Sequence, residues 1–357
     1  MRISINEKES NVVSVVKKIN LISLLCSSNN KGALMHFAIN RFIRRLFVFL
    51  LPLIAIYISI CAYALFYPSI FKTKADYIKE HKKEIEVLFL GSSHTQYAIN
   101  PRLIEADGRV MNLAYGGQTI KLNKMLLDKF SPEMKSLKYL MIELDYFSLE
   151  HSTGNEEYRQ PLYQTFYGIA GGDGDWWTRY FFTKEDLMFF AQSAALNVWN
   201  YFKNPDYAVN EWGFIENNVN YQFARMNYDE DEICRTLPHR LQGSHPHESV
   251  ENFETNAAFV DSLLQFCADN DIRPIFIGYP VYKSYYYFER PVKQARRLHY
   301  IKQAMKHYPN LLFWDFEQDS RFAVHDFWDD DHLDVSGANK LSEIINEKLK
   351  ETNTSPD

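Results

Sequence analysis

Cysteine is scarce in this chain, with four residues among 357. That number is too small for a disulfide scaffold, and no grouping of cysteine and histidine has the spacing of a metal site. We therefore expect no metal ion and no other cofactor. Cys234 and Cys267 could pair if they face an oxidising space, or Cys267 could be a buried thiol on the apolar face of a helix.

Long basic runs are also absent. The formal net charge is −6, whereas a protein that binds nucleic acid is expected to carry a clustered basic face. The sequence therefore argues against a nucleic-acid partner. Internal repeats and low-complexity segments are missing as well. With 46% apolar residues, the chain can bury a sizeable core in one large domain or two smaller ones.

Charged residues are missing from 46–67, a run long enough to cross a bilayer core of ~30 Å at ~1.5 Å per residue. We predict a transmembrane helix here. Three arginines stand just before it, which favours a cytoplasmic N-terminal segment at 1–45 and an external C-terminal part in a single-pass protein of the cell membrane. A cleaved signal peptide is the alternative, but the run is long for one and lacks a clear cleavage site. Met35 is a second possible start.

After a linker at 68–84, apolar runs alternate with amphipathic stretches up to residue 350, and 351–357 form a tail. This alternation is typical of a parallel sheet with helices on both faces. We predict an α/β fold, a flavodoxin-like three-layer sandwich around a central parallel sheet of about five strands. The expected strands are 85–90, 110–113, 137–144, 274–279 and 311–316, and the expected helices are 119–129, 252–270, 291–307 and 336–349.

The alternation stops between residues 147 and 249. This stretch contains Trp176, Trp177, Trp199 and Trp212, with a helical pattern around 184–202. A segment of this length inside a compact domain usually has a function or some helical structure. We interpret it as an insertion after the third strand, on the catalytic side of the sheet, that forms a lid or a substrate wall.

Two short motifs carry the chemistry, Gly91-Ser92-Ser93-His94 and Asp329-Asp330-Asp331-His332. The first follows the buried run at 85–90, so Ser93 would lie on the turn at the carboxyl end of a strand, where open α/β sheets bind ligands. A serine hydroxyl becomes a nucleophile when a base takes its proton and a carboxylate orients that base. Ser93 is the candidate nucleophile and His332 the candidate base, while His94 is interpreted as a neighbour that points elsewhere.

Each assignment has a simpler alternative. Ser93 could merely cap the helix that follows it, and the acidic run 329–331 could be a solvated or cation-binding loop. The two motifs together favour the catalytic interpretation, because the second supplies an imidazole with a carboxylate three residues earlier in Asp329.

The order of Gly-x-Ser, a glycine turn after the second strand and Asp-x-x-His near the end resembles the SGNH/GDSL hydrolase superfamily of esterases and O-acyltransferases. The resemblance covers the region from Ile85 to Leu349. With Tyr97-Ala98-Ile99-Asn100-Pro101 after it, Gly-Ser-Ser-His is most similar to membrane-anchored relatives found with cell-surface polysaccharide synthesis. It is also similar to the D-alanyl transfer protein of teichoic acid synthesis, whose motif begins Gly-Ser-Ser.

The resemblance implies a triad of Ser93, His332 and Asp329, and its spacing selects Asp329 over the two aspartates that follow. It also implies an oxyanion hole made by the backbone amides of Ser93 and Gly117. An ordinary strand-to-helix turn is the alternative for Gly117. The superfamily offers an asparagine after the third strand, whereas this chain has Asp145 there, which could bind a sugar hydroxyl or orient another group.

Tyrosines are frequent after the fourth predicted strand, where Tyr279 and Tyr282 begin the segment 279–287. Aromatic rings at this edge of the sheet can stack on sugar rings. They can equally pack against the insertion or the membrane interface. Tyr279, Tyr282 and Asp145 are the candidate substrate contacts.

The resemblance implies an acyl transfer enzyme, an O-acyltransferase such as an O-acetyltransferase, whose external domain modifies a cell-surface polysaccharide. Its partners would be that polysaccharide, an acyl donor and a membrane protein that exports the donor. Hydrolysis uses the same mechanism with water as acceptor, so an envelope carbohydrate esterase or deacetylase remains open. A non-catalytic assembly or binding subunit that keeps the fold also remains open.

Overall fold

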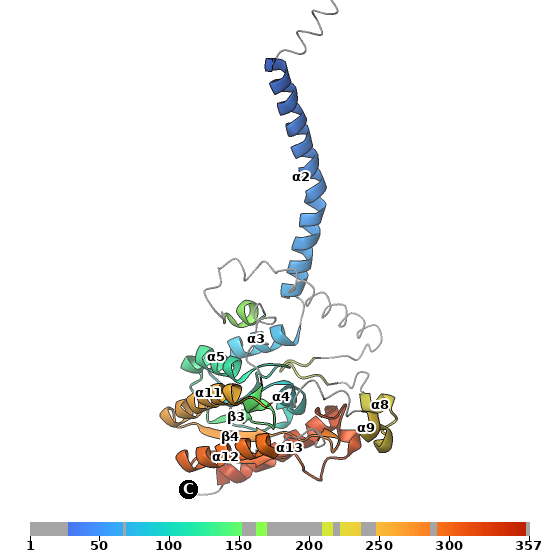
Figure 1. Ribbon diagram of the computed structural model, residues 1–357. Helices are drawn as coiled ribbons and strands as arrows, with labels where there is room; N and C mark the ends of the chain where they lie inside the picture. Colours follow the sequence, from blue (N-terminus) through green and yellow to red (C-terminus); the bar gives the residue numbers. More distant parts are fainter. Residues whose placement is uncertain are drawn as a thin grey trace, which may run out of the picture. The chain divides into compact units, whose positions relative to one another are not determined.

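The computed structural model describes residues 28–66, 69–151, 162–169, 209–216, 222–236, 248–285 and 291–354. The chain divides into two compact units, Met1–Tyr63 and Ala64–Asp357. Figure 1 shows the described elements of both units. The second unit holds the sheet and both sequence motifs.

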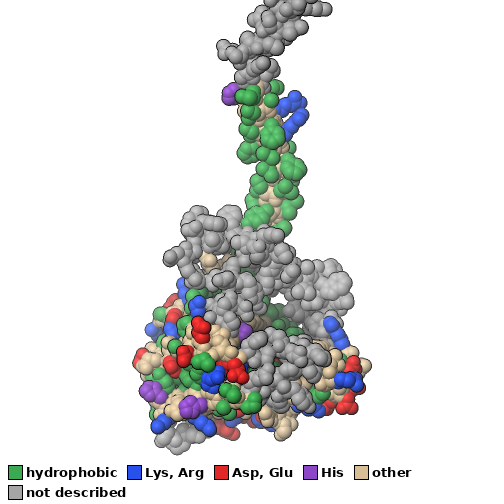
Figure 2. Space-filling view, viewed as in Figure 1, with side chains coloured by type: hydrophobic (Ala, Val, Ile, Leu, Met, Phe, Trp, Pro, Cys, Tyr) green, Lys and Arg blue, Asp and Glu red, His purple; other side chains and the backbone are tan. Residues whose placement is uncertain are grey.

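Helix α2 (Ser28–Phe66) begins in the first unit. Its stretch Met35–Tyr63 has a mean hydropathy of 2.5 and is long and apolar enough to cross a membrane. Large apolar side chains are exposed along it (Figure 2), which is typical of a helix whose surroundings are not water. The helix begins well before the predicted start at residue 46, so the arginines that precede the apolar run are helical too.

The second unit is built on a five-stranded sheet in the order β2-β1-β3-β4-β5, and every pair of neighbours is parallel. All residues of β1 and β3 are buried, as expected for strands covered on both faces. All five predicted strands are found, with differences at their ends. The strands are β1 (Ile85–Leu90), β2 (Arg109–Asn112), β3 (Tyr139–Glu143), β4 (Arg273–Gly278) and β5 (Leu312–Asp315).

Helices cover both faces of this sheet, which makes the unit an α/β fold. Helix α11 contacts α5 and α12, whereas α4 packs against α13. In Figure 1, α5 and α11 lie on one side of the sheet and α13 on the other. The bounds are α4 (Ser93–Ala98), α5 (Ile120–Phe130), α11 (Val250–Asp269), α12 (Pro291–His307) and α13 (Val335–Thr354), with 3-10 turns η1 (Pro101–Leu103), η2 (Ser131–Glu133), η3 (Ser148–Glu150) and η8 (Val324–Asp326).

The segment expected to be a linker contains a packed helix instead, α3 (Ile70–His81). The Ser69 hydroxyl caps it by accepting a backbone N–H. Phe71, Ala75 and Ile78 are buried on one face, since they recur at helical spacing. The linker prediction is therefore wrong for these residues, and the signal that would have corrected it was this apolar spacing.

The described parts of the predicted insertion pack against two regions of the second unit. The π-helical turn η5 (Tyr163–Tyr167) packs against Phe71 of α3 through its aromatic rings. Near the second motif, α8 (Gln222–Arg225) is tied to the chain by the Phe223 N–H, which donates to the Trp328 carbonyl at 2.9 Å; α9 (Glu230–Thr236) follows. The predicted helix at 184–202 and the tryptophans Trp176, Trp177 and Trp199 lie outside the described residues.

Cys234 and Cys267 are free thiols in this structure. Cys267 is buried on α11, and burial raises the pKa of its thiol to about 12. Of the two alternatives from the sequence, the structure therefore has the buried thiol, which is the unreactive form of the residue.

Candidate active site

The two motifs meet at the carboxyl edge of the sheet. Ser93 is the first residue of α4, directly after β1, and His332 lies in the loop between β5 and α13. Nε2 of His332 lies 2.8 Å from Oγ of Ser93. The residues that the sequence motifs predicted to act together are therefore within hydrogen-bonding distance, although 239 positions separate them in the chain.

Asp329 holds the opposite side of the imidazole. Nδ1 of His332 lies 3.0 Å from Oδ1 and 3.2 Å from Oδ2 of Asp329. Oδ1 also accepts the backbone N–H groups of His332 and Asp331 at 2.9 and 3.1 Å. This single carboxylate thus closes the turn of the loop and orients the ring, which fixes Nε2 toward Ser93.

Asp331 contacts the same ring, although the motif spacing selects Asp329 as the triad carboxylate. Its Oδ1 lies 3.1 Å from Nδ1 of His332. Burial alone would lower the pKa of His332, but the carboxylates of Asp331 and Asp329 outweigh burial and raise that pKa to about 10. These two carboxylates favour the protonated ring, and a positive charge close by would disfavour it.

Glu143 fixes the turn that carries Ser93, and the sequence interpretation missed it. One of its oxygens accepts the backbone N–H groups of Ser92 and Thr95 at 2.7 and 3.1 Å, and both hydroxyls of these residues also donate to the carboxylate. It is 4% exposed. A charged residue that ends an otherwise apolar strand run was the available signal, because such a carboxylate needs buried donors.

Gly91 makes this arrangement possible. A Cβ at this position would lie 2.0 Å from Oγ1 of Thr95 and 2.5 Å from Oε2 of Glu143. The backbone of residue 91 therefore passes directly against the Glu143 carboxylate, and a side chain there would push the two apart. The glycine of the first motif has a packing role beside the chemistry.

Asp145 lies in the same region but pairs with His94 rather than facing open space. Its Oδ2 lies 2.6 Å from Nδ1 of His94, and its Oδ1 accepts the backbone N–H of Tyr279 at 2.7 Å. The Asp145 and His94 side chains are 3% and 2% exposed. Asp145 therefore orients another group, and its alternative role as a substrate contact is not supported by this structure because no face of it is open.

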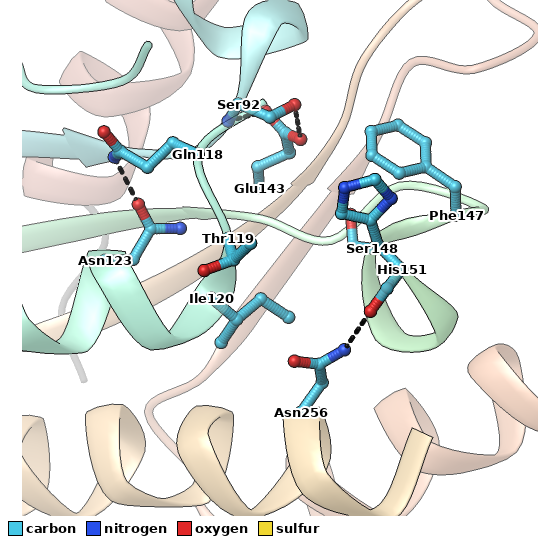
Figure 3. A pocket seen from close by; sticks show the side chains of 10 residues that line it. All are labelled: Ser92, Gln118, Thr119, Ile120, Asn123, Glu143, Phe147, Ser148, His151 and Asn256. Carbon is cyan, nitrogen blue, oxygen red and sulfur yellow. Dashed lines mark hydrogen bonds between the residues drawn. The ribbon is translucent and has the colours of Figure 1, made fainter. Parts of the chain in front are cut away.

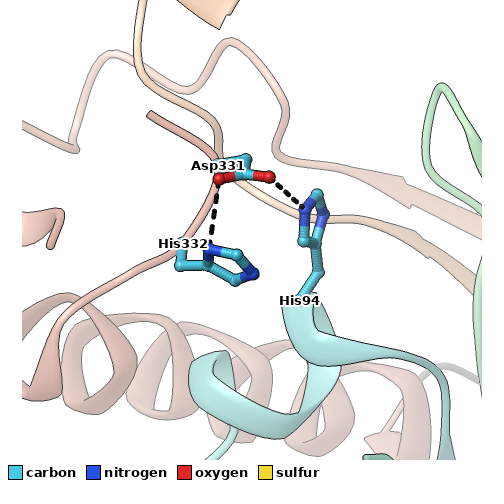
Figure 4. A group of neighbouring side chains, drawn as sticks. All are labelled: His94, Asp331 and His332. Atoms are coloured by element: carbon cyan, nitrogen blue, oxygen red, sulfur yellow. Dashed lines mark ion pairs between the residues drawn. The ribbon is translucent and has the colours of Figure 1, made fainter. Parts of the chain in front are cut away.

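Asp331 stands between the two histidines, as Figure 4 shows. Its second oxygen lies 3.8 Å from Nε2 of His94. His94, Asp331 and His332 each offer one nitrogen or oxygen atom, and these atoms lie within 4.8 Å of one another, a spacing at which a metal ion could be held. Within this group, however, each oxygen of Asp331 already faces an imidazole, and Nε2 of His332 already faces the Ser93 hydroxyl.

Gly117 lies in the turn after β2, on the same edge of the sheet. The turn is closed by the Gln118 N–H, which donates to the Tyr115 carbonyl at 2.8 Å, and Gly117 has a φ of 70° that favours glycine. The neighbouring Gly116 N–H donates to the Gln96 side chain of α4 at 2.6 Å. The glycine turn is thus anchored to the helix that carries Ser93.

Lys74 of α3 also contacts the segment that leads into this glycine turn. Its Nζ donates to the Ala114 carbonyl at 2.7 Å, and its side chain is 1% exposed. Burial lowers its pKa to about 7. Because Lys74 belongs to α3, the segment first interpreted as a linker contributes to the frame of the site.

Tyr279 and Tyr282 do not offer rings to a substrate. They are 1% and 6% exposed and belong to the main apolar core. The prediction that they line the substrate site is therefore wrong in this structure, because both rings are used for packing at the end of β4.

Other aromatic rings flank the candidate base. Tyr97 and Trp328 lie 4.9 Å apart between ring centroids, and they stand edge-on to His332 at 5.5 and 5.3 Å. Both are only partly buried. Tyr97 follows Ser93 by one helical turn, a spacing that could have identified it in the sequence.

A small pocket opens beside the site on the side of α5 and α11 (Figure 3). The volume open to the centre of a water-sized molecule is about 10 Å³, room for about one water. It is lined by Ser92, Gln118, Thr119, Ile120, Asn123, Glu143, Phe147, Ser148, His151 and Asn256. Since this lining includes neither the candidate nucleophile nor the candidate base, we do not assign the substrate to this pocket.

Comparison with known proteins does not place the chain in a family. No protein-family model matches the sequence, and no curated protein matches it.

Proposed function

We propose that the second unit transfers an acyl group through a covalent intermediate on Ser93. The observation that carries this proposal is the 2.8 Å contact between Oγ of Ser93 and Nε2 of His332, in a ring whose Nδ1 faces Asp329. Serine, imidazole and carboxylate in this order are the parts of an activated nucleophile. The resemblance of the two motifs to the SGNH/GDSL superfamily supports the same conclusion, as does the strand order, which fits a flavodoxin-like three-layer sandwich.

The proposed reaction has two steps. Oγ of Ser93 attacks the carbonyl carbon of an acyl donor while Nε2 of His332 takes the hydroxyl proton, and that proton then passes to the leaving group. In the second step, a hydroxyl of the acceptor gives its proton to Nε2 of His332 and attacks the acyl carbon, the bond from that carbon to Oγ of Ser93 breaks, and His332 returns the proton to Oγ. The backbone N–H groups of Ser93 and Gly117 are the proposed donors to the oxyanion in both steps.

The acceptor that we favour is a hydroxyl of a cell-surface polysaccharide. Its support is the motif resemblance together with the partly exposed rings of Tyr97 and Trp328 beside the base. Aromatic rings next to a reactive centre provide apolar faces on which sugar rings can pack. This pair replaces Tyr279 and Tyr282 in the proposal.

We further propose that α2 anchors the chain in the cell membrane, with the second unit outside. The run Met35–Tyr63 is long and apolar enough for this, and the arginines ahead of its most apolar part favour a cytoplasmic N-terminus. The acyl donor would then reach the site from a membrane exporter. A phosphatase reporter that works only after export, fused after Asp357, should be active; activity of a cytoplasm-only reporter at the same point would contradict the topology.

An envelope carbohydrate esterase or deacetylase is the second candidate, because the same groups would then activate water in the second step. A partly exposed Ser93 and His332 leave room for either acceptor. Mass spectrometry of surface polysaccharide from cells with the unaltered protein and with Ser93→Ala separates them. Loss of acyl groups in the variant indicates a transferase, and a gain indicates an esterase.

The mechanism is tested first by covalent labelling of the full-length protein with a fluorophosphonate probe. We expect the probe to be found on Ser93 by peptide mass spectrometry and labelling to vanish in Ser93→Ala. Ser92→Ala is the matched control, since Ser92 is 5% exposed and its hydroxyl donates to Glu143 rather than to His332. Labelling of a different serine, or none in the folded protein, would overturn the mechanism and favour a non-catalytic binding or assembly subunit.

A further inference from the structure

The buried pair of His94 and Asp145 has no part in the acyl-transfer steps above. Asp145 accepts on both oxygens, from Nδ1 of His94 at 2.6 Å and from the Tyr279 N–H at 2.7 Å. Phe147 closes another side of the His94 ring with an edge-on contact, 5.0 Å between centroids. An imidazole whose Nδ1 is fixed by a carboxylate has one orientation, and here its Nε2 faces Oδ2 of Asp331 at 3.8 Å.

Asp331 connects this pair to the candidate base. Its two oxygens face Nε2 of His94 at 3.8 Å and Nδ1 of His332 at 3.1 Å. The two imidazole rings lie 5.3 Å apart between centroids and are nearly perpendicular. A continuous row of alternating carboxylates and imidazoles therefore runs from Asp145 to His332. Figure 4 shows its last three members, His94, Asp331 and His332.

The charged groups in this row shift the pKa values of the two histidines. Burial would lower the pKa of His94, but the charge and hydrogen bond of Asp145, together with Asp331 and Glu143, raise it well above its ordinary value. A positive charge on His94 disfavours a proton on His332, whereas Asp329 and Asp331 favour one. Without that positive charge, the balance at His332 would move toward the two carboxylates, with burial still opposing them.

We propose that His94, held by Asp145, is a positioning residue for the Ser93–His332 pair: through Asp331 it fixes the ring of His332 and offsets the negative charge beside it. This inference rests on the proposed function, because it concerns the base of that reaction. It assigns a purpose to the last residue of the first motif, which the acyl-transfer steps leave unused. It also explains why two carboxylates can share Nδ1 of His332 in a buried place.

The test is the pH dependence of Ser93 labelling by the fluorophosphonate probe, measured on the full-length protein in detergent. Labelling needs His332 without its proton, so the rate rises with pH until that residue is neutral. His94→Gln removes the positive charge and leaves Asp331, so the rising limb should move to higher pH by about one unit. At a fixed pH below the limb, this is about a tenfold loss of rate.

Asp331→Asn removes a carboxylate from the same ring, so its limb should move to lower pH. A role in packing alone does not predict shifts of opposite sign from two neighbours in one row. Asp145→Asn should shift the limb in the same direction as His94→Gln and by less, because the imidazole is still present. His299→Gln, at an exposed position on α12, is the matched control and should leave the profile unchanged.

Three outcomes would overturn the inference: unchanged limbs in both variants, shifts of the same sign in both, or a stoichiometric metal ion in the purified protein that is lost in His94→Gln. If His94→Gln does not fold, Asp145→Asn carries the test, because it acts on His332 through His94: an unchanged limb or a downward shift in this variant would overturn the inference. Failure of the proposed function looks different, because Ser93 would then not be labelled in the unaltered protein at any pH.

Discussion

Two histidines at the edge of this sheet have similar partners and different surroundings. Both direct Nδ1 toward an aspartate, at 2.6 Å for His94 and 3.0 Å for His332. Nε2 of His332 faces a serine hydroxyl at 2.8 Å, whereas Nε2 of His94 faces a carboxylate at 3.8 Å. The His332 side chain is 14% exposed and the His94 side chain 2%.

The difference shows what makes an imidazole a candidate general base. A carboxylate on Nδ1 orients an imidazole ring, but the ring can act as a base only if its Nε2 faces a group that carries a removable proton. A residue next to the serine in the sequence need not be the one that faces its hydroxyl. His94 follows Ser93 directly, yet the hydroxyl is approached by a histidine from the far end of the chain. In the proposed mechanism, the open ring of His332 acts on the hydroxyl and the closed ring of His94 supports it.

The strongest test of the difference between the two histidines is to remove each imidazole in turn. His332→Gln and Ser93→Ala should each lower the labelling or turnover rate by about 10⁴-fold or more, and combining them should cost little more, because cooperating residues are not additive. At pH values above the rising limb of its own pH profile, the His94→Gln protein should retain most of the labelling or turnover rate. Rates from a quenched ester substrate at several pH values measure this.

The result that would refute the assignment is a His94→Gln protein as inactive as His332→Gln at every pH, with both proteins folded by circular dichroism. His94 would then be part of the reacting set, and the difference in Nε2 partners would have no meaning for function.

The next comparison is between the two aspartates that hold Nδ1. Asp329→Asn should lower the rate by about 10²-fold, less than the ~10⁴-fold expected of a triad with one carboxylate, because Asp331 still faces the ring. Some of the loss will come from the loop, since Asp329 also accepts two backbone N–H groups. The double variant Asp329→Asn with Asp331→Asn should approach the loss seen in His332→Gln. A double variant no worse than Asp329→Asn would remove Asp331 from the site.

The strands and major helices could be predicted from the sequence because their apolar patterns are strong. β1 and α12 were found at the expected bounds, and the other strands differ at their ends. The linker interpretation of 68–84 overlooked α3, a short amphipathic helix between the apolar span and the first strand. Its spacing of Phe71, Ala75 and Ile78 was nevertheless visible.

For the site, motif spacing identified the two partners that the structure brings together, Ser93 and His332. It could not identify Glu143 or the pairing of His94 with Asp145, because these depend on how strand ends are arranged side by side. It also placed Tyr279 and Tyr282 at the correct edge of the sheet. Whether a ring there faces solvent or core is decided by packing, which periodicity over a short loop does not reveal.

The contacts of Gly91 and Glu143 with the turn that carries Ser93 form the frame of the site, and this frame can be tested at Gly91. In Gly91→Ala, the new Cβ would overlap the Thr95 and Glu143 side chains, so we expect the free energy of unfolding to fall by about 1–3 kcal/mol. Urea unfolding of the full-length protein in detergent measures it. Glu143→Gln is the companion variant: it keeps the size of the side chain and loses the charge that accepts the Ser92 and Thr95 N–H groups. An unfolding midpoint unchanged in both would contradict the role of this frame.

The smallest expected effects concern the aromatic rings that lie beside each of the two histidines. Tyr97 and Trp328 stand beside the open histidine, whereas Phe147 closes over the buried one. If the acceptor sugar packs on the open side, Trp328→Ala should raise KM for a glycan acceptor by about tenfold, which corresponds to about 1.4 kcal/mol. Tyr97→Ala should raise it somewhat less, because the smaller ring offers less contact area.

Phe147→Ala is the matched control for these two variants. It is 6% exposed and contacts His94 rather than His332, so it should lower stability without a selective change in KM. Turnover with a simple aryl acetate separates the effects further, because such a donor does not need the sugar-packing rings. Trp328→Ala should therefore leave aryl acetate turnover nearly unchanged while weakening glycan use. An equal loss on both substrates would mean that Trp328 supports the His332 loop, and the approach of the substrate from the open side would then lose its main support.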